Sequence, residues 1–489
     1  MIIQIIERNK PDYMKVKNYF GIFTKRMIAM LVFISLGLPI IVQAQGNMPK
    51  ILSMRERAKV INNWLYTRAQ TIMPMLMERE GIDMWIVMSR EYNEDPVIKT
   101  MLPAEWRAAR RRTILVISLP KGPVKDKGKK VETLAIARYN VGKVFKRAWN
   151  PEKQPNQWQA LAEVIKQRNP AKIALNYSKE FGLADGVNWM EMEEMKKNIP
   201  AKYAKRIVSG EKLAIGWLET RIPQEMAVYT QVMRIAHQII REGFSEKVIQ
   251  PGVTTTKDVE WWYLDRIAEL KLQTWFHPTV DVQRNDTDRS KANRSFAAKP
   301  GEEVIMPGDL IHVDFGITYL RLNTDTQQLA YILKPNETEV PKGLREAMKV
   351  GTRLEDILTS QFKKGRTGNE VLKGALDQAK REGIKATIYT HPIGFHGHGA
   401  GPTIGLWDQQ GGVPGKGDYP LYYNTAYSIE LNAKVAIPEW NNKVVRIMLE
   451  EDGFFDQTGF QYIGGRQSEI YSIPRVVKYL DVKKKKTAE

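Results

Sequence analysis

Three short segments in the second half of the chain alternate between apolar and polar residues, which predicts strands with one buried face. They cover residues 310–315, 428–433 and 445–450. In each segment the apolar side chains point to one face, and an acidic residue lies on the other: Asp314, Glu430 and Glu450. The pattern predicts a sheet with a core on one side and a polar cavity on the other.

Helical spacing of apolar residues alternates with short apolar runs along the rest of the chain. Strands are expected in the first half at residues 84–88, 113–119, 133–137 and 172–175. Helices are expected at residues 54–79, 157–167, 225–242, 256–270, 343–363 and 368–382. The alternation in the first half indicates an α/β domain with a mixed or parallel sheet covered by helices.

Turn-forming residues near positions 208–222 mark a boundary between two domains. We expect one domain at residues 45–210 and a second at 211–480, followed by a basic tail at 481–489. A Lys-rich stretch at residues 121–130 is expected to be a solvated hairpin tip. The overall fold class is therefore α/β or α+β.

The amino-acid composition excludes some kinds of functional site and partner. The chain has 489 residues, is 43% apolar and has 12 Trp, which favours packed globular domains. It has no cysteine, which excludes disulfides, thiolate metal sites and a cysteine nucleophile. The formal net charge is +19, but we find no basic helix interleaved with aromatic residues. Nucleic acid is therefore not an expected partner.

The N-terminus resembles an export signal. Lys25 and Arg26 precede an apolar run at residues 27–42, and Ala44 fits a signal-peptidase cleavage site. The expectation is a signal peptide at residues 1–44 and a periplasmic or secreted protein without stable membrane insertion. An uncleaved anchor is the alternative, and Met14 and Met27 are alternative translation starts.

The candidate chemistry lies in four acidic residues and a histidine-glycine cluster. Asp314 and Asp325 are eleven residues apart, and Glu430 and Glu450 follow later. The cluster His391-Pro-Ile-Gly-Phe-His396-Gly-His398-Gly-Ala-Gly401 lies between the two pairs of acids. Carboxylates with one imidazole are suitable ligands for a pair of divalent cations.

The order of these motifs resembles the M24 metallopeptidases, which include methionine aminopeptidase, Xaa-Pro aminopeptidase, prolidase and creatinase. The resembling features are Asp-x-Gly at Asp314, a second Asp eleven residues on, Gly-His-Gly-x-Gly at His398, and two late Glu. Residues 50–210, including Arg90–Pro96, resemble the creatinase-type N-terminal domain. The resemblance implies that domain followed by a pita-bread catalytic domain, with two divalent ions (Mn, Co, Zn or Fe).

The resemblance also implies roles for individual residues. The metal ligands would be Asp314, Asp325, His398, Glu430 and Glu450, with Asp325 and Glu450 bridging the two ions. Glu450 would also move the proton, and His391 and His396 would support catalysis or face the substrate. Glu451 replaces Glu450 if the strand register slips by one, and His396 is the rival of His398. His312 is expected to be a packed residue, or to hold the metal ligands in place, and not to be a ligand itself.

The chain departs from the family pattern at three places. The family usually has a second histidine seven residues after the ligand histidine, which counted from His398 is Gly405. The usual Thr-Arg-Thr after the second Asp is here Thr326-Gln327-Gln328. The nearest upstream histidine, His277, is 37 residues before Asp314. These departures concern substrate positioning and Xaa-Pro specificity.

The expected function is that of an exported metallo-exopeptidase, an aminopeptidase or dipeptidase similar to Xaa-Pro aminopeptidase or prolidase. It would hydrolyse peptide bonds with a hydroxide that bridges two metal ions. A homodimer is expected from the family. Two alternatives remain: a creatinase-like C–N hydrolase without metal, and a catalytically silent binding protein like the histone-chaperone relatives. Metal content and peptide turnover distinguish these hypotheses.

Overall fold

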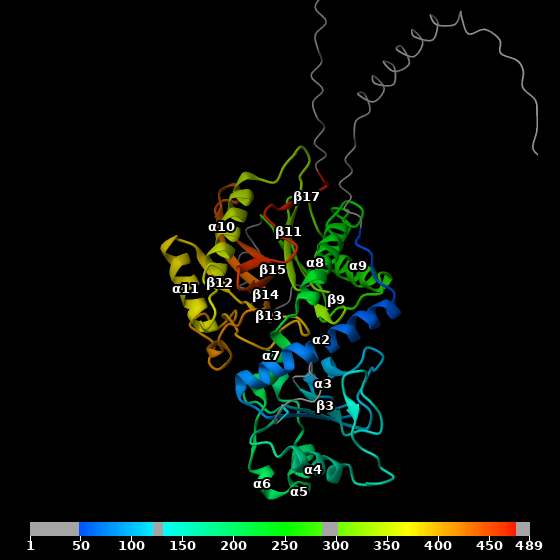
Figure 1. The fold of residues 1–489 in the computed structure, drawn as a ribbon. Helices are drawn as coiled ribbons and strands as arrows, with labels where there is room; N and C mark the ends of the chain where they lie inside the picture. The colour runs from blue at the N-terminus through cyan, green and yellow to red at the C-terminus, as the bar shows by residue number, and fades with distance from the viewer. Residues whose placement is uncertain (1–47, 121–130, 286–301, 476–489) are drawn as a thin grey trace, which may run out of the picture. The chain divides into compact units, whose positions relative to one another are not determined.

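The computed structural model describes residues 48–120, 131–285 and 302–475 (Figure 1). The predicted signal peptide, the Lys-rich hairpin tip and the basic tail lie outside these residues. Within the described ranges, no helix combines the length and the apolar character that crossing a bilayer would require.

A six-stranded mixed sheet forms the first half of the described chain. Its strand order is β4–β3–β2–β1–β5–β6, and β1 pairs antiparallel with β2 and parallel with β5. The strands are β1 (Met84–Arg90), β2 (Arg112–Ser118), β3 (Glu132–Ala135), β4 (Lys146–Arg147), β5 (Ile173–Leu175) and β6 (Ile207–Ser209). The helices are α2 (Met54–Glu80), α3 (Pro96–Met101), α4 (Gln157–Arg168), α5 (Trp189–Asn198), α6 (Ala201–Ala204) and α7 (Glu211–Glu219). The predicted strands and helices of this half all form.

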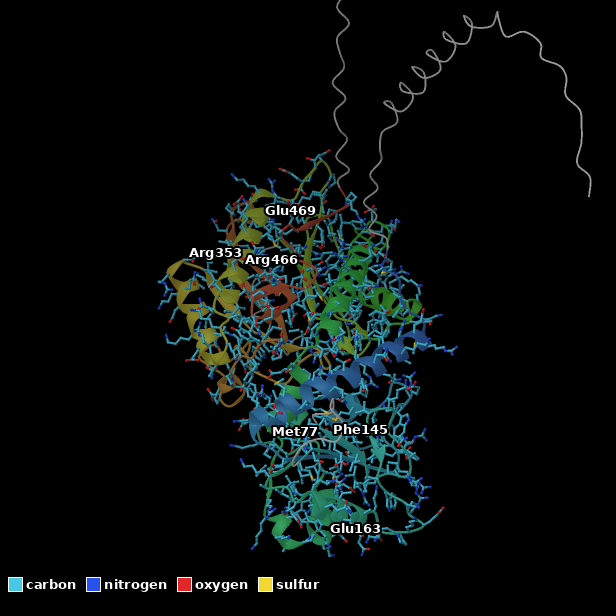
Figure 2. The ribbon with its side chains drawn as sticks, in the orientation of Figure 1. Met77, Phe145, Glu163, Arg353, Arg466 and Glu469 are labelled. Atoms are coloured by element: carbon cyan, nitrogen blue, oxygen red, sulfur yellow. The ribbon has the colours of Figure 1, made fainter. Side chains whose placement is uncertain are left out.

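Helix α2 is delimited by its caps and contacts residues of both halves of the chain. It begins after Ser53, which forms a capping box with Glu56, and ends at Gly81 in the left-handed conformation. Met77 of α2 and Phe145 belong to the same buried core (Figure 2). Arg68, 1% exposed, donates hydrogen bonds to the Trp217 and Thr220 carbonyls and pairs with Glu225 at 3.1 Å.

A nine-stranded sheet forms the second half. Its main path is β12–β14–β15–β11–β8–β7, with β13, β16 and β17 added at its sides. The strands of this sheet are β7 (Thr279–Gln283), β8 (Leu310–Phe315), β11 (Thr326–Ile332), β12 (Lys385–Ile388), β13 (His391–Ile393), β14 (Thr425–Ile437), β15 (Lys443–Asp456), β16 (Gly459–Tyr462) and β17 (Tyr471–Ile473). A separate pair, β9 (Thr318–Tyr319) and β10 (Leu322–Asn323), leads into β11. The helices are α8 (Pro223–Gly243), α9 (Thr256–Glu269), α10 (Lys342–Thr359) and α11 (Gly368–Arg381).

Two hydrophobic cores flank this sheet. Ile311, Val313 and Phe315 of β8 are fully buried in the core that contains α8 and α9. The apolar residues of β14 and β15, such as Ile429 and Leu449, are buried in the core that contains α10 and α11. On all three strands the apolar residues alternate with the acidic ones, as predicted, but cores lie on both sides of the sheet and not on one side only. The mixed α/β fold class is confirmed.

Candidate metal centre

The strand register brings the predicted acids into one row. On neighbouring strands, Asp314 of β8 lies opposite Gln327 of β11, and Gln327 lies opposite Glu450 of β15. Glu450 in turn lies opposite Glu430 of β14. Residues opposite one another on adjacent strands have close side chains. Asp325, immediately before β11, completes the cluster.

The described residues contain three groups of potential metal donors, and two of these groups share Glu450. One ligand atom from each of Asp314, Asp325 and Glu450 lies within 4.8 Å of the others, and the same holds for His391, Glu430 and Glu450. Glu450 belongs to both sets. A carboxylate can contribute one oxygen to each of two cations, so this donor arrangement fits a pair of divalent ions that share Glu450.

His391 is the histidine that joins the acids. Its Nε2 is 3.8 Å from Asp325 Oδ2 and 3.9 Å from Glu450 Oε1. Its Nδ1 is 3.0 Å from the Pro392 carbonyl oxygen, which can only accept, so Nδ1 carries the hydrogen. Nε2 is buried and has no hydrogen-bond partner among the described residues. A histidine held in this way by its second nitrogen is typical of a metal ligand.

The protonation of His391 agrees with that interpretation. Burial, and then the neighbouring His398, lower the pKa of His391 to about 3. The imidazole is therefore neutral at physiological pH, and its Nε2 lone pair is directed at the carboxylates.

His398 and His396 lie differently from the sequence-based expectation. His398 is exposed, its ring centroid is 4.8 Å from that of His391, and it joins a donor group only with Asp325 and His391. His396 is in none of the three donor groups found among the described residues. Burial, followed by the charges of Arg221 and Lys99, lowers the pKa of His396 to about 4.

The position of the second histidine changes when His391 is taken as the first. The residue seven positions after His391 is His398, so the family spacing counted from His391 ends on a histidine. At Gly405 the backbone φ is +74°, and a Cβ would lie 2.3 Å from the Ile388 carbonyl oxygen. A histidine at 405 would not fit there, so the apparent departure at Gly405 follows from counting from His398.

Crowding of the carboxylates shifts their protonation. Burial raises the pKa of Glu450 to about 7. Burial, and then the charges of the other acids, raise the pKa of Asp325 and Glu430 well above the usual range. Bound cations would offset this repulsion, which is a second reason that the cluster fits metal ions.

The choice between Glu450 and Glu451 can be read from their contacts. Glu451 Oε2 is 2.6 Å from His237 Nε2, and Glu451 Oε1 accepts a hydrogen bond from Gln328 at 2.8 Å. Glu451 therefore lies on the opposite face of β15, as strand alternation requires. Glu450 is the residue that lies beside the other acids.

Several residues that surround the cluster were not identified from the sequence. Ser428 donates to Glu450 at 2.6 Å, and the Gln327 amide donates to both Glu430 and Glu450. The Trp275 indole donates to the Thr324 carbonyl at 3.0 Å, and its ring centroid is 5.1 Å from that of His398. Their partners are far away in the sequence, so local patterns gave no signal for them.

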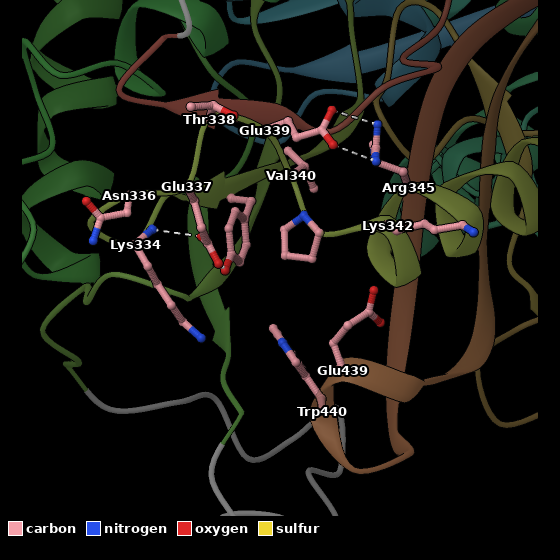
Figure 3. A pocket seen from close by; sticks show the side chains of 12 residues that line it. Lys334, Asn336, Glu337, Thr338, Glu339, Val340, Lys342, Arg345, Glu439 and Trp440 are labelled. Carbon is pink, nitrogen blue, oxygen red and sulfur yellow. Dashed lines mark hydrogen bonds and ion pairs between the residues drawn. The ribbon is translucent and has the colours of Figure 1, made fainter.

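His277 and a separate cavity lie apart from this cluster. His277 Nε2 is 3.4 Å from Glu260, and His277 is in none of the donor groups. A cavity of about 380 Å³ lies between the end of β11 and the start of α10 (Figure 3). Two of its charged lining residues, Glu339 and Arg345, form an ion pair at 2.9 Å. It contains none of the predicted site residues.

Sequence comparison gives a family match within the second half of the chain. Residues 229–453, which include every predicted ligand, match metallopeptidase family M24. The predicted enzyme class, a metallopeptidase hydrolase, is confirmed, and with it peptides as the class of substrate.

Solved structures show the same fold over most of the chain. An X-Pro aminopeptidase from Thermotoga maritima is 17% identical with a TM-score of 0.57, covering 81% of this chain and 99% of its own. An Xaa-Pro dipeptidase from Bacillus anthracis is 16% identical with a TM-score of 0.52, covering 86% and 100%. A prolidase from Pyrococcus horikoshii is 12% identical with a TM-score of 0.50, covering 84% and 99%. No curated protein sequence matches the chain.

Proposed function

We propose that the protein is an exopeptidase that binds two divalent ions and cleaves peptides next to proline. The observation that carries this proposal is the pair of donor groups that share Glu450. The proline preference is supported by the descriptions of the structurally similar proteins, an X-Pro aminopeptidase, an Xaa-Pro dipeptidase and a prolidase. Export to the periplasm or beyond is part of the proposal and rests on the N-terminal sequence, and a homodimer is part of it on the basis of the family resemblance.

The ligand set that we propose differs from the sequence prediction in one residue. Asp314, Asp325 and Glu450 would hold one ion, and His391, Glu430 and Glu450 would hold the other, with Asp325 also near His391. His391 takes the place predicted for His398 because it lies with Glu430 and Glu450, whereas His398 does not. Manganese, cobalt, zinc and iron all accept this donor set.

The residues around the donors suggest how the chain would assist hydrolysis. Bound ions would supply an activated water and polarise the peptide carbonyl. The Glu450 carboxylate would accept the proton of the attacking water and return it to the leaving amine. His398 is exposed beside His391 and Trp275, which puts it in reach of a peptide at the cluster.

The test compares neighbouring glutamates. Glu450→Gln removes a charge from the cluster, and Glu451→Gln makes the same change on the opposite face of β15. The wild-type protein, reconstituted with Mn²⁺, is expected to release amino acids from a panel of Xaa-Pro peptides and dipeptides. Glu450→Gln should abolish turnover and reduce the bound metal measured by mass spectrometry, whereas Glu451→Gln should keep both.

Other results would reject parts of the proposal. Cleavage of peptides that lack proline, at equal or greater efficiency, would refute the proline preference. A wild-type protein that binds metal and cleaves no peptide would favour the binding-protein alternative. Turnover that persists in Glu450→Gln would show that the shared carboxylate is not catalytic.

A further inference from the structure

Gln327 occupies an unusual place in the row of acids. It is the only residue of the row without a carboxyl group, and it lies between Asp314 and Glu450 on the neighbouring strands. It is 6% exposed. Its Nε2 donates to Glu430 Oε1 at 2.9 Å and to Glu450 Oε2 at 2.7 Å. A single amide group therefore connects two of the candidate ligands.

The orientation of this amide is fixed by the chemistry of its partners. Glu430 and Glu450 must be ionised to bind cations, and ionised carboxylates can only accept hydrogen bonds, so the NH₂ group faces them. The Gln327 Oε1 then faces His312 Nε2, at 2.9 Å. His312 is 4% exposed and must carry a hydrogen on Nε2 to donate to this oxygen. His312 thus holds the amide oxygen on the side away from the acids.

We propose that Gln327 is a positioning residue that sets the separation of Glu430 and Glu450, and that His312 acts through it by fixing its amide. This inference rests on the metal site of the proposed function. Two buried carboxylates repel each other when ionised, and a donor shared between them offsets the repulsion and orients the oxygens before the ions bind. The residue thus adds to the donor set without being a ligand.

Loss of the Gln327 amide should lower the affinity for the two ions unequally. Glu430 belongs only to the donor group of His391, whereas Glu450 belongs to both groups. Loss of the Gln327 amide would disturb two donors of the His391 group and one donor of the Asp314 group. The ion at His391 should therefore lose more affinity.

The next residue on the strand provides a matched control. Gln328 is 1% exposed, and its Nε2 donates to Glu451 at 2.8 Å on the opposite face of the sheet. Gln327→Met and Gln328→Met each remove a buried amide that bonds a buried carboxylate, on the same strand. Both should lower the melting temperature, because buried carboxylates lose a donor. Only the first should alter metal binding.

The measurement is calorimetric titration of the chelator-treated, full-length protein with Mn²⁺. Partners that orient metal ligands typically contribute about 10–100-fold to metal affinity. Gln327→Met is expected to weaken at least one Mn²⁺ site by that factor, and Gln328→Met to leave the affinity within about threefold of wild type. Unchanged or tighter Mn²⁺ binding by Gln327→Met overturns the proposal, and so does an equal loss in both variants.

A double-mutant cycle tests the part assigned to His312. His312→Leu alone should weaken Mn²⁺ binding, because the Gln327 amide is then free to rotate. In the Gln327→Met background the same change should have no further effect on Mn²⁺ affinity, since His312 has nothing left to orient. Additive losses would show that His312 acts independently of Gln327 and would refute this part.

The two proposals fail in different ways. If the wild-type protein binds Mn²⁺ and cleaves peptides while Gln327→Met binds Mn²⁺ as tightly, the positioning role fails and the proposed function stands. If the wild-type protein binds Mn²⁺ without cleaving any peptide, the proposed function fails and the affinity comparison still decides the role of Gln327. A wild-type protein that binds no Mn²⁺, Co²⁺ or Zn²⁺ overturns both.

Discussion

The buried acids predict how stability depends on pH when no metal is bound. Burial raises the pKa of Glu450 to about 7, from 4.5 in the unfolded chain. Between these values the folded state holds a proton that the unfolded state has lost. Stability of the metal-free protein should therefore fall, through this group, as the pH rises from 5 to 7.

The size of the effect follows from the shift in pKa. Two pH units correspond to about 3 kcal/mol, since one unit is worth about 1.4 kcal/mol. The histidines act in the opposite direction, because burial lowers the pKa of His391 and His396, so the net pH dependence of the wild type mixes both. Comparison with Glu450→Gln cancels the contribution of the histidines and isolates that of the acids.

The assay is urea unfolding followed by tryptophan fluorescence, in metal-free buffer at pH 5.0 and 7.5. Between the two pH values, the wild type should lose about 3 kcal/mol more than Glu450→Gln. Removing the Glu450 charge also lowers the pKa of Asp325 and Glu430, which both respond to it, and this adds to the difference.

Adding Mn²⁺ should reverse the trend. At a concentration 100 times the dissociation constant, one bound ion adds about 2.7 kcal/mol to the free energy of unfolding. Protons compete with the ion, so the gain should be larger at pH 7.5 than at pH 5.0. The reasoning is refuted if the wild type and Glu450→Gln show the same pH dependence, or if Mn²⁺ stabilises both equally.

Two further predictions concern the histidine-rich segment and its glycines. His391→Asn should weaken Mn²⁺ binding by more than the roughly 10–100-fold typical of a supporting residue, whereas His398→Asn should retain Mn²⁺ and lower kcat/KM; the reverse order would restore His398 as the ligand. Gly405→Ala should lower the melting temperature more than Gly383→Ala, because both have φ near +73° but only the Cβ at 405 meets a backbone atom, the Ile388 oxygen at 2.3 Å. Equal melting temperatures would show that the backbone at 405 moves aside.

Many helices and strands were predictable because they depend on the local spacing of apolar and polar residues. The alternation in β8, β14 and β15 identified the acidic face, and the same alternation correctly favoured Glu450 over Glu451 as the neighbour of the other acids. Helices with caps, such as α9 after Thr255 and α11 after Thr367, begin close to the predicted positions. These features depend on neighbours within one strand or one turn of helix.

The histidine could not be chosen in the same way. His391 lies in β13, which is only three residues long, and a periodicity cannot be recognised over so few positions. His398 was predicted as the ligand instead because it lies in the Gly-His-Gly-x-Gly motif. His391 lies among the acids because it pairs with Ser428 on β14. Local sequence patterns do not predict this long-range contact.

Gln327 was missed for a related reason. All seven residues of β11 are buried, and the strand lacks the alternation that marks an exposed face. The two carboxylates that Gln327 contacts are 103 and 123 residues away in the sequence. From the sequence it was only a departure from Thr-Arg-Thr, without an indication of what it touches.

The buried Arg68 on α2 has a consequence for how the chain is made. Its ion-pair partner, Glu225, is 157 residues later in the sequence. At about 5–20 residues per second, a ribosome needs about 8–30 s to synthesise that interval. Until then α2 carries a guanidinium whose native acceptors do not yet exist, and it cannot be buried at low cost. The burial of Arg68 must therefore wait for α7 and α8, so the packing of α2 is completed only after the start of the second half has been synthesised.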